Sequence, residues 1–302
     1  MNILFTGASS CTGMHFVQDL ALRGHQLTCV FTRSMKEYHG IRKERILRIL
    51  PYVKAIWNTK FGGRSFCTLI QENNFDTYAH HMAWTKGYGT ENYDIQKALR
   101  NNTNHLSKVI DLLQKNGCVQ VILTNSVFEG LDIICEGGDA PFESHGTAKK
   151  ETTKAFLAFT SKLPIRRFII PNPIGIYDNT RLVEYLHTSW QKGETPHIRY
   201  PENIRDNIPI PALRKQYTKF IEGTELKTAP SGWVQNNQSF VQMVALELQK
   251  RFSYTTPCIF GPQTDYHQPI RLHNTDPILP MQRESEFWDN LCTHYAKRFG
   301  ND

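Results

Sequence analysis

A histidine and a lysine stand four residues apart in the segment SHGTAKK, residues 144–150, at the start of a predicted helix. Side chains at this spacing lie on one helix face, so we expect His145 and Lys149 to stack one above the other. Imidazole gains and loses protons near neutral pH, which makes the pair a candidate for proton transfer beside a positive charge. A polar helix start without chemistry is the alternative interpretation.

A second candidate site lies near the N-terminus, where TGASSCTG occupies residues 6–13. Gly7 permits a tight turn, and Gly13 allows a strand and a helix to pack closely. The backbone N–H groups between them can face a pyrophosphate at a helix N-terminus, and they belong to Ser9, Ser10, Cys11 and Thr12. Because the segment follows a predicted strand and opens a predicted helix, it predicts a dinucleotide-binding loop rather than a glycine-rich turn alone.

The residues after the second predicted strand indicate which dinucleotide is bound. Proteins that bind NAD place Asp or Glu there to bond the ribose hydroxyls, whereas an arginine accommodates the 2′-phosphate of NADP. This chain has Arg33 and Ser34 in the segment FTRS. A guanidinium group can bind phosphate through two parallel hydrogen bonds, so the sequence favours NADP. A surface arginine without a ligand is the alternative.

Alternating strands and helices must position these segments. The predicted strands are residues 2–6, 27–32, 52–56, 75–83, 119–124 and 165–170. Apolar residues repeating every three or four positions predict one long helix over about 95–113 and another over about 147–161. Strands and helices alternating at this spacing indicate a parallel sheet with right-handed crossovers. The expected fold class is therefore α/β, a doubly wound, Rossmann-like parallel sheet.

The pattern changes in the second half of the chain. Proline and glycine become frequent, residues 191–211 indicate loops and short strands, and two later helices are predicted at 239–252 and 285–299. We expect a dinucleotide-binding domain over residues 1–170 and a smaller C-terminal substrate-binding lobe over 171–302, with some crossing of the chain between the two.

Composition narrows the class of protein. The 302 residues carry a formal net charge of +7, with 40% hydrophobic and 21% charged residues, which is ordinary for a globular protein. The Lys and Arg residues concentrated between Arg33 and Arg64 would suit a nucleic acid or a phosphorylated small molecule. Aromatic residues are not interleaved there as in a base-stacking surface, so we expect a small-molecule substrate and no nucleic acid.

The sequence predicts neither a membrane span nor a secreted protein. No apolar run approaches the roughly 20 residues of a transmembrane helix, and the N-terminus lacks the pattern of a signal peptide. The seven cysteines are scattered without a C-x-x-C pair, which favours reduced thiols in the cytoplasm and disfavours a metal site.

Several segments, in this order and spacing, resemble the extended short-chain dehydrogenase/reductases, the family of nucleotide-sugar epimerases and dehydratases. TGASSCTG resembles the family's cofactor motif T-G-x-x-G-x-x-G, with Ser10 in place of the middle glycine. FDTYAHHMA (75–83) resembles D-x-V-x-H-x-A-A, with His80 and Ala83 matching. LTNSVFEG (123–130) is similar to the serine-bearing strand end S-S-x-x-V-Y-G.

Two further segments extend the resemblance to about residue 220. PNPIGIY (171–177) resembles N-V-x-G-P, and residues 192–210 resemble a substrate-lobe segment that carries an arginine. Trp84, just after the fourth predicted strand, could line the substrate cleft or cover the core. The resemblance implies cofactor contacts from His80, Ala83, Lys149 and Pro171, and substrate contacts from Ser126, Asn172 and Arg205.

In this family, a tyrosine exchanges the proton and a lysine four residues later, in the motif Y-G-x-x-K, holds the nicotinamide ribose. SHGTAKK resembles this motif with histidine in place of tyrosine. The resemblance implies that His145 and Lys149 take these catalytic roles. It also implies that Ser126 binds the substrate oxygen, with Thr124 as the second candidate.

The histidine leaves three interpretations open. His145 can itself be the proton carrier, although a neighbouring lysine disfavours the charged imidazole and leaves a ring that is a poor acid. The chemistry can instead have moved to another residue, such as His81 or Tyr177. In the third interpretation the fold has kept cofactor binding and lost catalysis.

The resemblance implies an NADP-dependent oxidoreductase or epimerase acting on a nucleotide-linked sugar. Among these, a keto-sugar reductase is favoured by analogy, because NADP suits net hydride delivery. The alternative is a catalytically impaired NADP-binding sensor or assembly protein of the same fold. We also expect a homodimer formed by helices near 94–115 and 147–161, where apolar residues include Ala155, Phe156 and Phe159.

Overall fold

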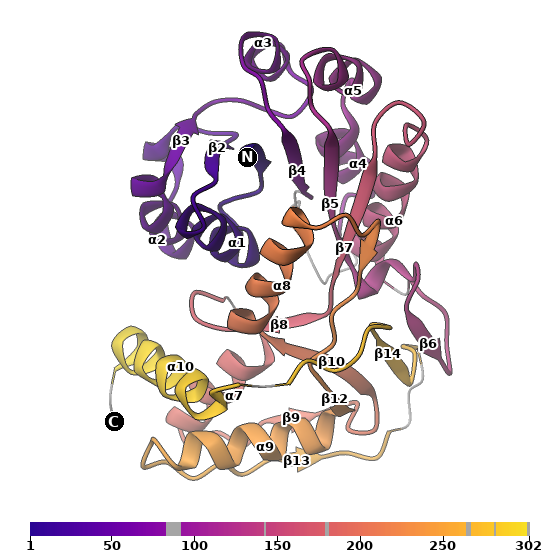
Figure 1. Ribbon diagram of the computed structural model, residues 1–302. Coiled ribbons are helices and arrows are strands. Elements are labelled where there is room, and N and C mark those ends of the chain that lie inside the picture. Colours follow the sequence, from indigo (N-terminus) through magenta and orange to yellow (C-terminus); the bar gives the residue numbers. More distant parts are fainter. Residues whose placement is uncertain (83–91, 142, 179–180, 264–266, 281, 301–302) are drawn as a thin grey trace. The chain divides into compact units, whose positions relative to one another are not determined.

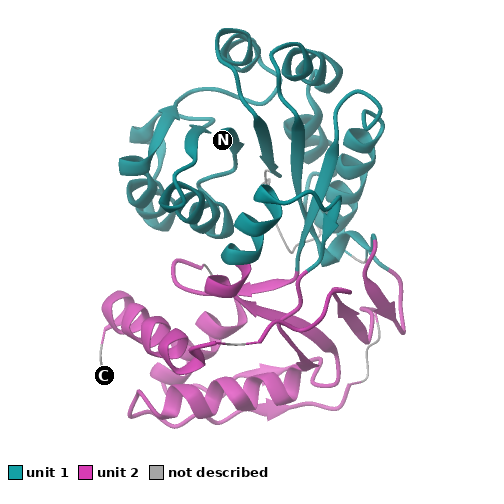
Figure 2. Ribbon diagram, viewed as in Figure 1, with its two compact units in different colours: residues 1–131, 140–170, 214–229 teal, residues 132–139, 171–213, 230–302 magenta. Residues whose placement is uncertain are grey.

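The computed structural model describes residues 1–82, 92–141, 143–178, 181–263, 267–280 and 282–300 (Figure 1). The chain divides into two compact units. Unit 1 comprises residues 1–131, 140–170 and 214–229, and unit 2 comprises residues 132–139, 171–213 and 230–302 (Figure 2). The chain crosses between the two units at 132–139 and at 214–229, in addition to the boundary after residue 170.

Unit 1 is built on a seven-stranded sheet in which all neighbouring strands are parallel, in the order β11-β7-β5-β4-β1-β2-β3. The strands are β1 (Asn2–Thr6), β2 (Gln26–Val30), β3 (Val53–Ile56), β4 (Thr77–His81), β5 (Gln120–Ser126), β7 (Ile165–Ile170) and β11 (Lys227–Thr228). This confirms the predicted parallel sheet and the six predicted strands. The short β11 was not predicted, because it lies beyond the point where the strand–helix alternation ends.

The helices that connect these strands are α1 (Cys11–Leu22), α2 (Gly40–Ile49), α3 (Arg64–Glu72), α4 (Ile95–Thr103), α5 (Leu106–Lys115) and α6 (Ser144–Leu157). Helix α8 (Ile210–Glu222) starts in unit 2 and continues into unit 1. The prediction of a single long helix over 95–113 is wrong, because the helix is interrupted between α4 and α5. His105 adopts a left-handed backbone conformation there, with φ +48°, which a right-handed helix cannot continue through.

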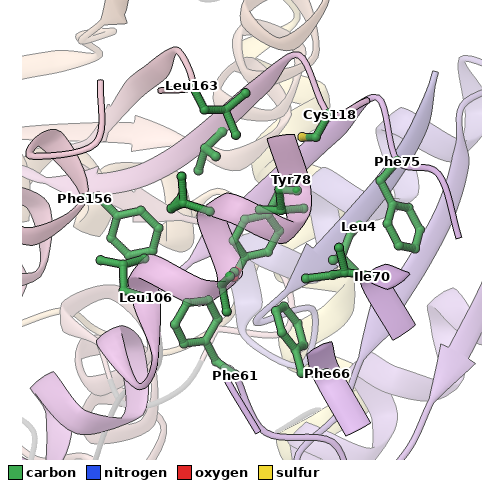
Figure 3. Packing of buried hydrophobic residues seen from close by; sticks show 14 of the residues in the cluster. Leu4, Phe61, Phe66, Ile70, Phe75, Tyr78, Leu106, Cys118, Phe156 and Leu163 are labelled. Carbon is green, nitrogen blue, oxygen red and sulfur yellow. The ribbon is translucent and has the colours of Figure 1, made fainter. Parts of the chain in front are cut away.

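Helices cover both faces of the unit 1 sheet. On one face, helices α3, α5 and α6 bury a cluster that includes Leu4, Phe66, Tyr78, Leu106 and Phe156 (Figure 3). On the other face, Phe16 of α1 stacks on Tyr217 of α8 with ring centroids 3.9 Å apart, and both rings meet Phe168 of β7. Successive strand residues point to opposite faces, so both layers are needed to bury them. The sheet is doubly wound, as predicted.

Unit 2 contains a five-stranded sheet and a two-stranded sheet. The larger sheet has the order β12-β10-β14-β6 with β8 beside β10, and its strands are β6 (Ile134–Glu136), β8 (Asn172–Ile174), β10 (Ile204–Pro209), β12 (Trp233–Asn236) and β14 (Arg271–His273). The smaller sheet pairs β9 (His197–Ile198) with β13 (Ile259–Phe260). Helices α7 (Leu182–Gln191), α9 (Asn237–Gln249) and α10 (Glu284–Phe299) enclose a core that includes Trp190, Phe240 and Trp288.

Three further observations concern the class of protein. No helix in the described part of the chain is long and apolar enough to cross a membrane. All seven cysteines are free thiols. Among the described residues, no group of three or more His, Cys, Asp or Glu side chains is placed to hold a metal ion.

Candidate active site

The glycine loop joins β1 to α1 at the carboxyl edge of the unit 1 sheet. Gly7 has φ +80°, and a Cβ atom there would lie 2.5 Å from the backbone oxygen of His81, at the end of β4. Only glycine satisfies both the left-handed conformation and this close approach. A Cβ atom at Gly13 would likewise collide with the backbone oxygen of Gly7. Both glycines are therefore required by packing within the loop itself.

Ser10, which replaces the middle glycine of the motif, caps helix α1. Its backbone is extended, with φ −76°, so the position does not need glycine. Its Oγ accepts a hydrogen bond from the N–H of Gly13 at 3.0 Å, which turns the side chain back onto the helix. The loop therefore keeps its tight turn and leads into a helix N-terminus. Ser9 precedes the capping residue, and Cys11 and Thr12 begin the helix. These features suit a pyrophosphate, because helix N-termini attract anions and glycines allow a close backbone approach.

His80 and His81 end β4 and point to opposite faces of the sheet. His80 is buried beside the rings of Phe61 and Phe156, and its Nδ1 lies 2.6 Å from the hydroxyl oxygen of Tyr78. Burial, with a further contribution from the charge of Lys149, lowers the pKa of His80 to about 3. His80 is therefore a neutral core residue in the structure, and its expected contact with the cofactor stays a prediction.

His81 packs on the opposite face against Phe5 and Phe16 of the α1 side. Its Nε2 lies 3.2 Å from Oγ1 of Thr12, in the first turn of α1, so it links β4 to the glycine loop. Burial and the nearby charge of Lys149 lower the pKa of His81 to about 3. A histidine that stays neutral in this way is a poor general acid, which disfavours the interpretation that catalysis has moved to His81.

Arg33 and Ser34 follow β2, as the cofactor prediction requires. Arg33 is exposed. The N–H and the hydroxyl of Ser34 both donate to Oε2 of Glu37, at 2.9 and 2.7 Å. These bonds are the main cause that lowers the pKa of the Glu37 carboxyl, and the charge of Arg33 adds to them. The carboxylate of Glu37 therefore accepts the hydrogen bonds of Ser34, a residue that we predicted to bind the cofactor.

Ser126 is the last residue of β5 and caps a short 3-10 helix, η3 (Val127–Glu129). Its side chain is partly exposed, whereas Thr124 is fully buried within the strand. The Oγ of Ser126 accepts a hydrogen bond from the N–H of Phe128 at 3.4 Å. Of the two candidate hydroxyl residues, Ser126 is therefore the more accessible to a substrate.

His145 lies in the first turn of α6 and is buried. Its Nδ1 lies 2.7 Å from Oε2 of Glu143, and its ring packs against Phe128 at 5.1 Å and Tyr93 at 6.4 Å between centroids. The next residue, Gly146, lies against the backbone oxygen of Phe128, where a Cβ atom would collide. The glycine after the histidine therefore allows α6 to pack on the turn that follows Ser126.

Lys149 lies one helical turn after His145 and is partly buried. Burial lowers the pKa of Lys149, and the negative charge of Glu129 opposes this effect. The charge of Lys149 in turn acts on both His80 and His81. The charge of Lys149 therefore acts on the two histidines that end β4 and on Glu129, which follows β5.

The predicted residues of unit 2 form their own contacts. Pro171 is buried and precedes Asn172, the first residue of β8, which pairs with Asn207 of β10. The guanidinium of Arg205 is buried and donates to the backbone oxygens of Ile204 and Pro269 at 2.9 and 3.0 Å, and to Oε1 of Gln268 at 3.2 Å. Arg205 thus joins β10 to the segment before β14 within unit 2. Substrate contacts from Asn172 and Arg205 stay predictions.

Ala83, Trp84 and Tyr177 are the other residues predicted for the site. Ala83 and Trp84 lie outside the described residues. Tyr177, the other candidate for a relocated acid, belongs to unit 2 and has a left-handed backbone with φ +61°. Its N–H donates to Nε2 of His294 at 3.2 Å, and the two rings are 4.5 Å apart.

Two acidic residues of the site, Glu129 and Glu143, were not predicted from the sequence. Glu129 had a usable signal, because Ser126 and Glu129 form the pattern S-x-x-E that is typical of a capping box, and the structure contains that capping box. Glu143 had no comparable signal. Its pairing with His145 depends on how the chain enters α6, which the spacing of two residues does not reveal.

The sequence matches the NAD dependent epimerase/dehydratase family over residues 3–206. The chain belongs to this family. The family is that of the extended short-chain dehydrogenase/reductases, so the resemblance inferred from the motifs is confirmed. No protein in a search of curated sequences matches the chain.

Solved structures of epimerases and dehydratases share the fold of this family member. UDP-glucose 4-epimerase of Thermotoga maritima, solved with UDP-glucose, has a TM-score of 0.76 at 15% identity, covering 99% of this chain and 100% of the epimerase. UDP-glucuronic acid 4-epimerase of Bacillus cereus, solved with UDP-glucuronic acid and NAD, has a TM-score of 0.78 at 13% identity, with the same coverage of both chains. A dTDP-glucose 4,6-dehydratase of Streptomyces venezuelae, solved with NAD, has a TM-score of 0.74 at 13% identity, covering 99% and 98%.

Proposed function

We propose that the protein is an NADP-dependent, cytoplasmic enzyme that acts on a nucleotide-linked sugar, and that it reduces a keto-sugar. Its family supports a nicotinamide dinucleotide and this class of substrate. The similar structures from Thermotoga maritima and Bacillus cereus contain UDP-sugars, which supports the same class. The cofactor supplies hydride chemistry when it is bound, and the residues described above supply binding and proton transfer.

One observation carries this proposal. Lys149 is partly buried and carries its charge beside the ends of β4 and β5, one turn after His145. The ends of β4 and β5 belong to the carboxyl edge of the parallel sheet, where Rossmann-like folds bind their ligands. We assign Lys149 to the nicotinamide ribose, His145 to proton exchange and Ser126 to the substrate oxygen.

The preference for NADP rests on Arg33. No acidic residue occupies positions 31–34, whereas Arg33 is exposed and able to bind a 2′-phosphate. Glu37 accepts hydrogen bonds from the N–H and the hydroxyl of Ser34. These two bonds would have to break if Ser34 also binds that phosphate. We therefore assign the selectivity chiefly to Arg33.

The homodimer also remains a proposal. Phe156, which contributed to the prediction, is fully buried in the unit 1 core and is not available to a partner. Ala155 and Phe159 are partly exposed, as is Leu99 on α4. These residues leave a smaller apolar surface for the proposed contact, which a measurement of mass in solution at micromolar concentration would test directly.

The proposed activity can be tested with NADPH and a panel of nucleotide-linked 4-keto-sugars. We expect the absorbance of NADPH to fall with at least one substrate, and a Lys149→Met variant to lose both affinity and rate. If NADPH binds but no sugar is reduced, the alternative of an NADP-binding sensor or assembly protein becomes the better account. If the protein binds no nicotinamide dinucleotide, both functions are wrong.

A further inference from the structure

Glu129 is a buried carboxylate that the proposed reaction does not yet use. It is the last residue of η3, and only 1% of its surface is exposed. Oε1 accepts a hydrogen bond from the N–H of Ser126 at 2.8 Å. Oε2 accepts two more, from Nδ2 of Asn125 at 2.6 Å and from Oγ1 of Thr153 at 2.8 Å.

These three bonds join the two elements that carry the candidate catalytic groups. Asn125 and Ser126 end β5, whereas Thr153 lies on α6. Thr153 and Lys149 are four residues apart, so they share the face of α6 that meets Glu129. The carboxylate therefore joins α6, the helix that carries Lys149, to the end of β5.

The hydrogen bonds also indicate the charge of Glu129. All three partners donate, and a carboxylate that only accepts satisfies them, whereas a protonated carboxyl would add a donor of its own. Burial raises the pKa of Glu129, and the charge of Lys149 is the largest of the effects that oppose this rise. Glu129 and Lys149 thus each favour the charged form of the other.

We propose that Glu129 is a positioning residue that keeps Lys149 charged and holds it against the Ser126 turn, so that Lys149 binds the cofactor up to alkaline pH. This inference rests on the proposed function, because it concerns the lysine assigned to the nicotinamide ribose. It adds a residue that acts through Lys149 and does not touch the substrate.

The other groups around Lys149 do not supply this effect. His80 and His81 on β4 have pKa values of about 3, so they are neutral throughout the neutral and alkaline range. On α4, which packs along α6, Lys97 and Arg100 are exposed to solvent. Of the described acidic residues, Glu129 is the one whose charge is found to act on Lys149.

The first test measures NADPH affinity against pH for the full chain and for Glu129→Gln. The charge of Glu129 opposes the lowering of the pKa of Lys149, so we expect the alkaline loss of affinity to begin about one pH unit lower in the variant. Glu129→Asp keeps the charge and should restore most of the alkaline range. An unchanged alkaline midpoint in a folded Glu129→Gln protein would overturn the inference.

Two control variants separate charge from structure. Glu151→Gln removes an exposed carboxylate of the same helix, which pairs with Lys154 at 2.8 Å, and should leave the midpoint in place. Thr153→Val removes one bond to Glu129 but no charge, so it should reduce stability without moving the midpoint. If Thr153→Val shifts the midpoint as far as Glu129→Gln does, the role of Glu129 is purely structural and the inference is wrong.

A second test needs no cofactor and therefore separates this inference from the proposed function. Urea unfolding is measured for the unmodified protein, Glu129→Gln, Lys149→Met and the double variant. We expect Lys149→Met to change the unfolding midpoint differently in the Glu129→Gln background, because the two charges interact. Additive effects would overturn the inference. Coupled effects in a protein that binds no NADPH would support the Glu129–Lys149 pair while the proposed function fails.

Discussion

The two ends of the unit 1 site are built in different ways. At the β1–α1 turn, the geometry is imposed by backbone atoms, since Gly7 and Gly13 each lie where a Cβ atom would collide with a backbone oxygen. At the β5–α6 end, the geometry depends on side chains, with Glu129 bonded to three donors and Glu143 beside His145.

This difference explains which parts of the family pattern the chain retains. A backbone constraint admits only glycine, whereas a side-chain network can exchange one acid or one donor for another if its partners change too. The glycine that departs from the motif is replaced by Ser10, whose backbone has φ −76° and does not require glycine. At the other end, His145 replaces the tyrosine of the motif. Two acidic residues accompany it, Glu143 beside His145 and Glu129 beside Ser126.

The largest effect should follow from filling the glycine loop. We expect Gly7→Ala to destabilise the protein by about 3 kcal/mol or more and to abolish dinucleotide binding, because alanine at φ +80° would also crowd the backbone oxygen of His81. Urea unfolding and calorimetric titration with NADPH would measure the two effects.

Gly24 is the matched control for this variant. It has φ +86°, but no atom lies within 4 Å of a Cβ built there. Gly24→Ala should therefore cost only the backbone strain, about 1–2 kcal/mol, and leave binding intact. Equal losses for the two variants would mean that crowding at Gly7 is unimportant.

The backbone-determined part of the molecule is also the part that the sequence predicts well. Six strands of the unit 1 sheet, its parallel arrangement and the glycine loop follow from apolar runs and from the place of Gly7 and Gly13. These signals are local and periodic. The break at His105 was missed because apolar spacing continues through it, and only the backbone conformation reveals two helices.

The side-chain part was predicted incompletely, for a physical reason. The spacing of His145 and Lys149 on one helix is a local pattern, but the bond from Glu129 to Thr153 joins residues 24 positions apart. The contacts of Arg205 within unit 2 were likewise not predicted. Arg205 suits a diphosphate by its chemistry, yet its guanidinium binds backbone oxygens of unit 2, which no spacing in the sequence indicates.

The next largest effect concerns the proton carrier at the side-chain end. If His145 exchanges the proton, His145→Ala should reduce the reaction rate by about 10²–10⁴-fold with little change in NADPH affinity. His145→Tyr restores the residue of the family motif, but the ring would have to fit between Phe128 and Tyr93, and we expect a loss of activity as well. Nearly full turnover by His145→Ala would place the acid elsewhere.

A smaller effect should appear in the dependence of stability on pH. The pKa of His80 is about 3 in the folded protein, below the value of roughly 6.5 in an unfolded chain, so the unfolded state binds more protons between these values. Stability is therefore fully present above pH 6.5 and falls as the pH decreases toward 3. For one such histidine the loss between pH 7 and pH 5 is about 2 kcal/mol. Urea unfolding of His80→Gln should show a shallower decline, whereas exposed His39→Gln should match the unmodified protein.

The smallest expected effect concerns the affinity for NADPH and the role of Arg33, which follows β2. Arg33→Ala should weaken NADPH binding by about 1 kcal/mol and leave NADH binding unchanged, because an exposed arginine loses a solvent-screened bond to the 2′-phosphate alone. Glu37→Gln is the informative companion, since it removes a negative charge and frees the donors of Ser34. If Ser34 contributes to the phosphate site, this variant should strengthen NADPH binding and not NADH binding. Calorimetry with both dinucleotides decides the matter, and equal or tighter binding of NADH by the unmodified protein would show that Arg33 does not select the cofactor.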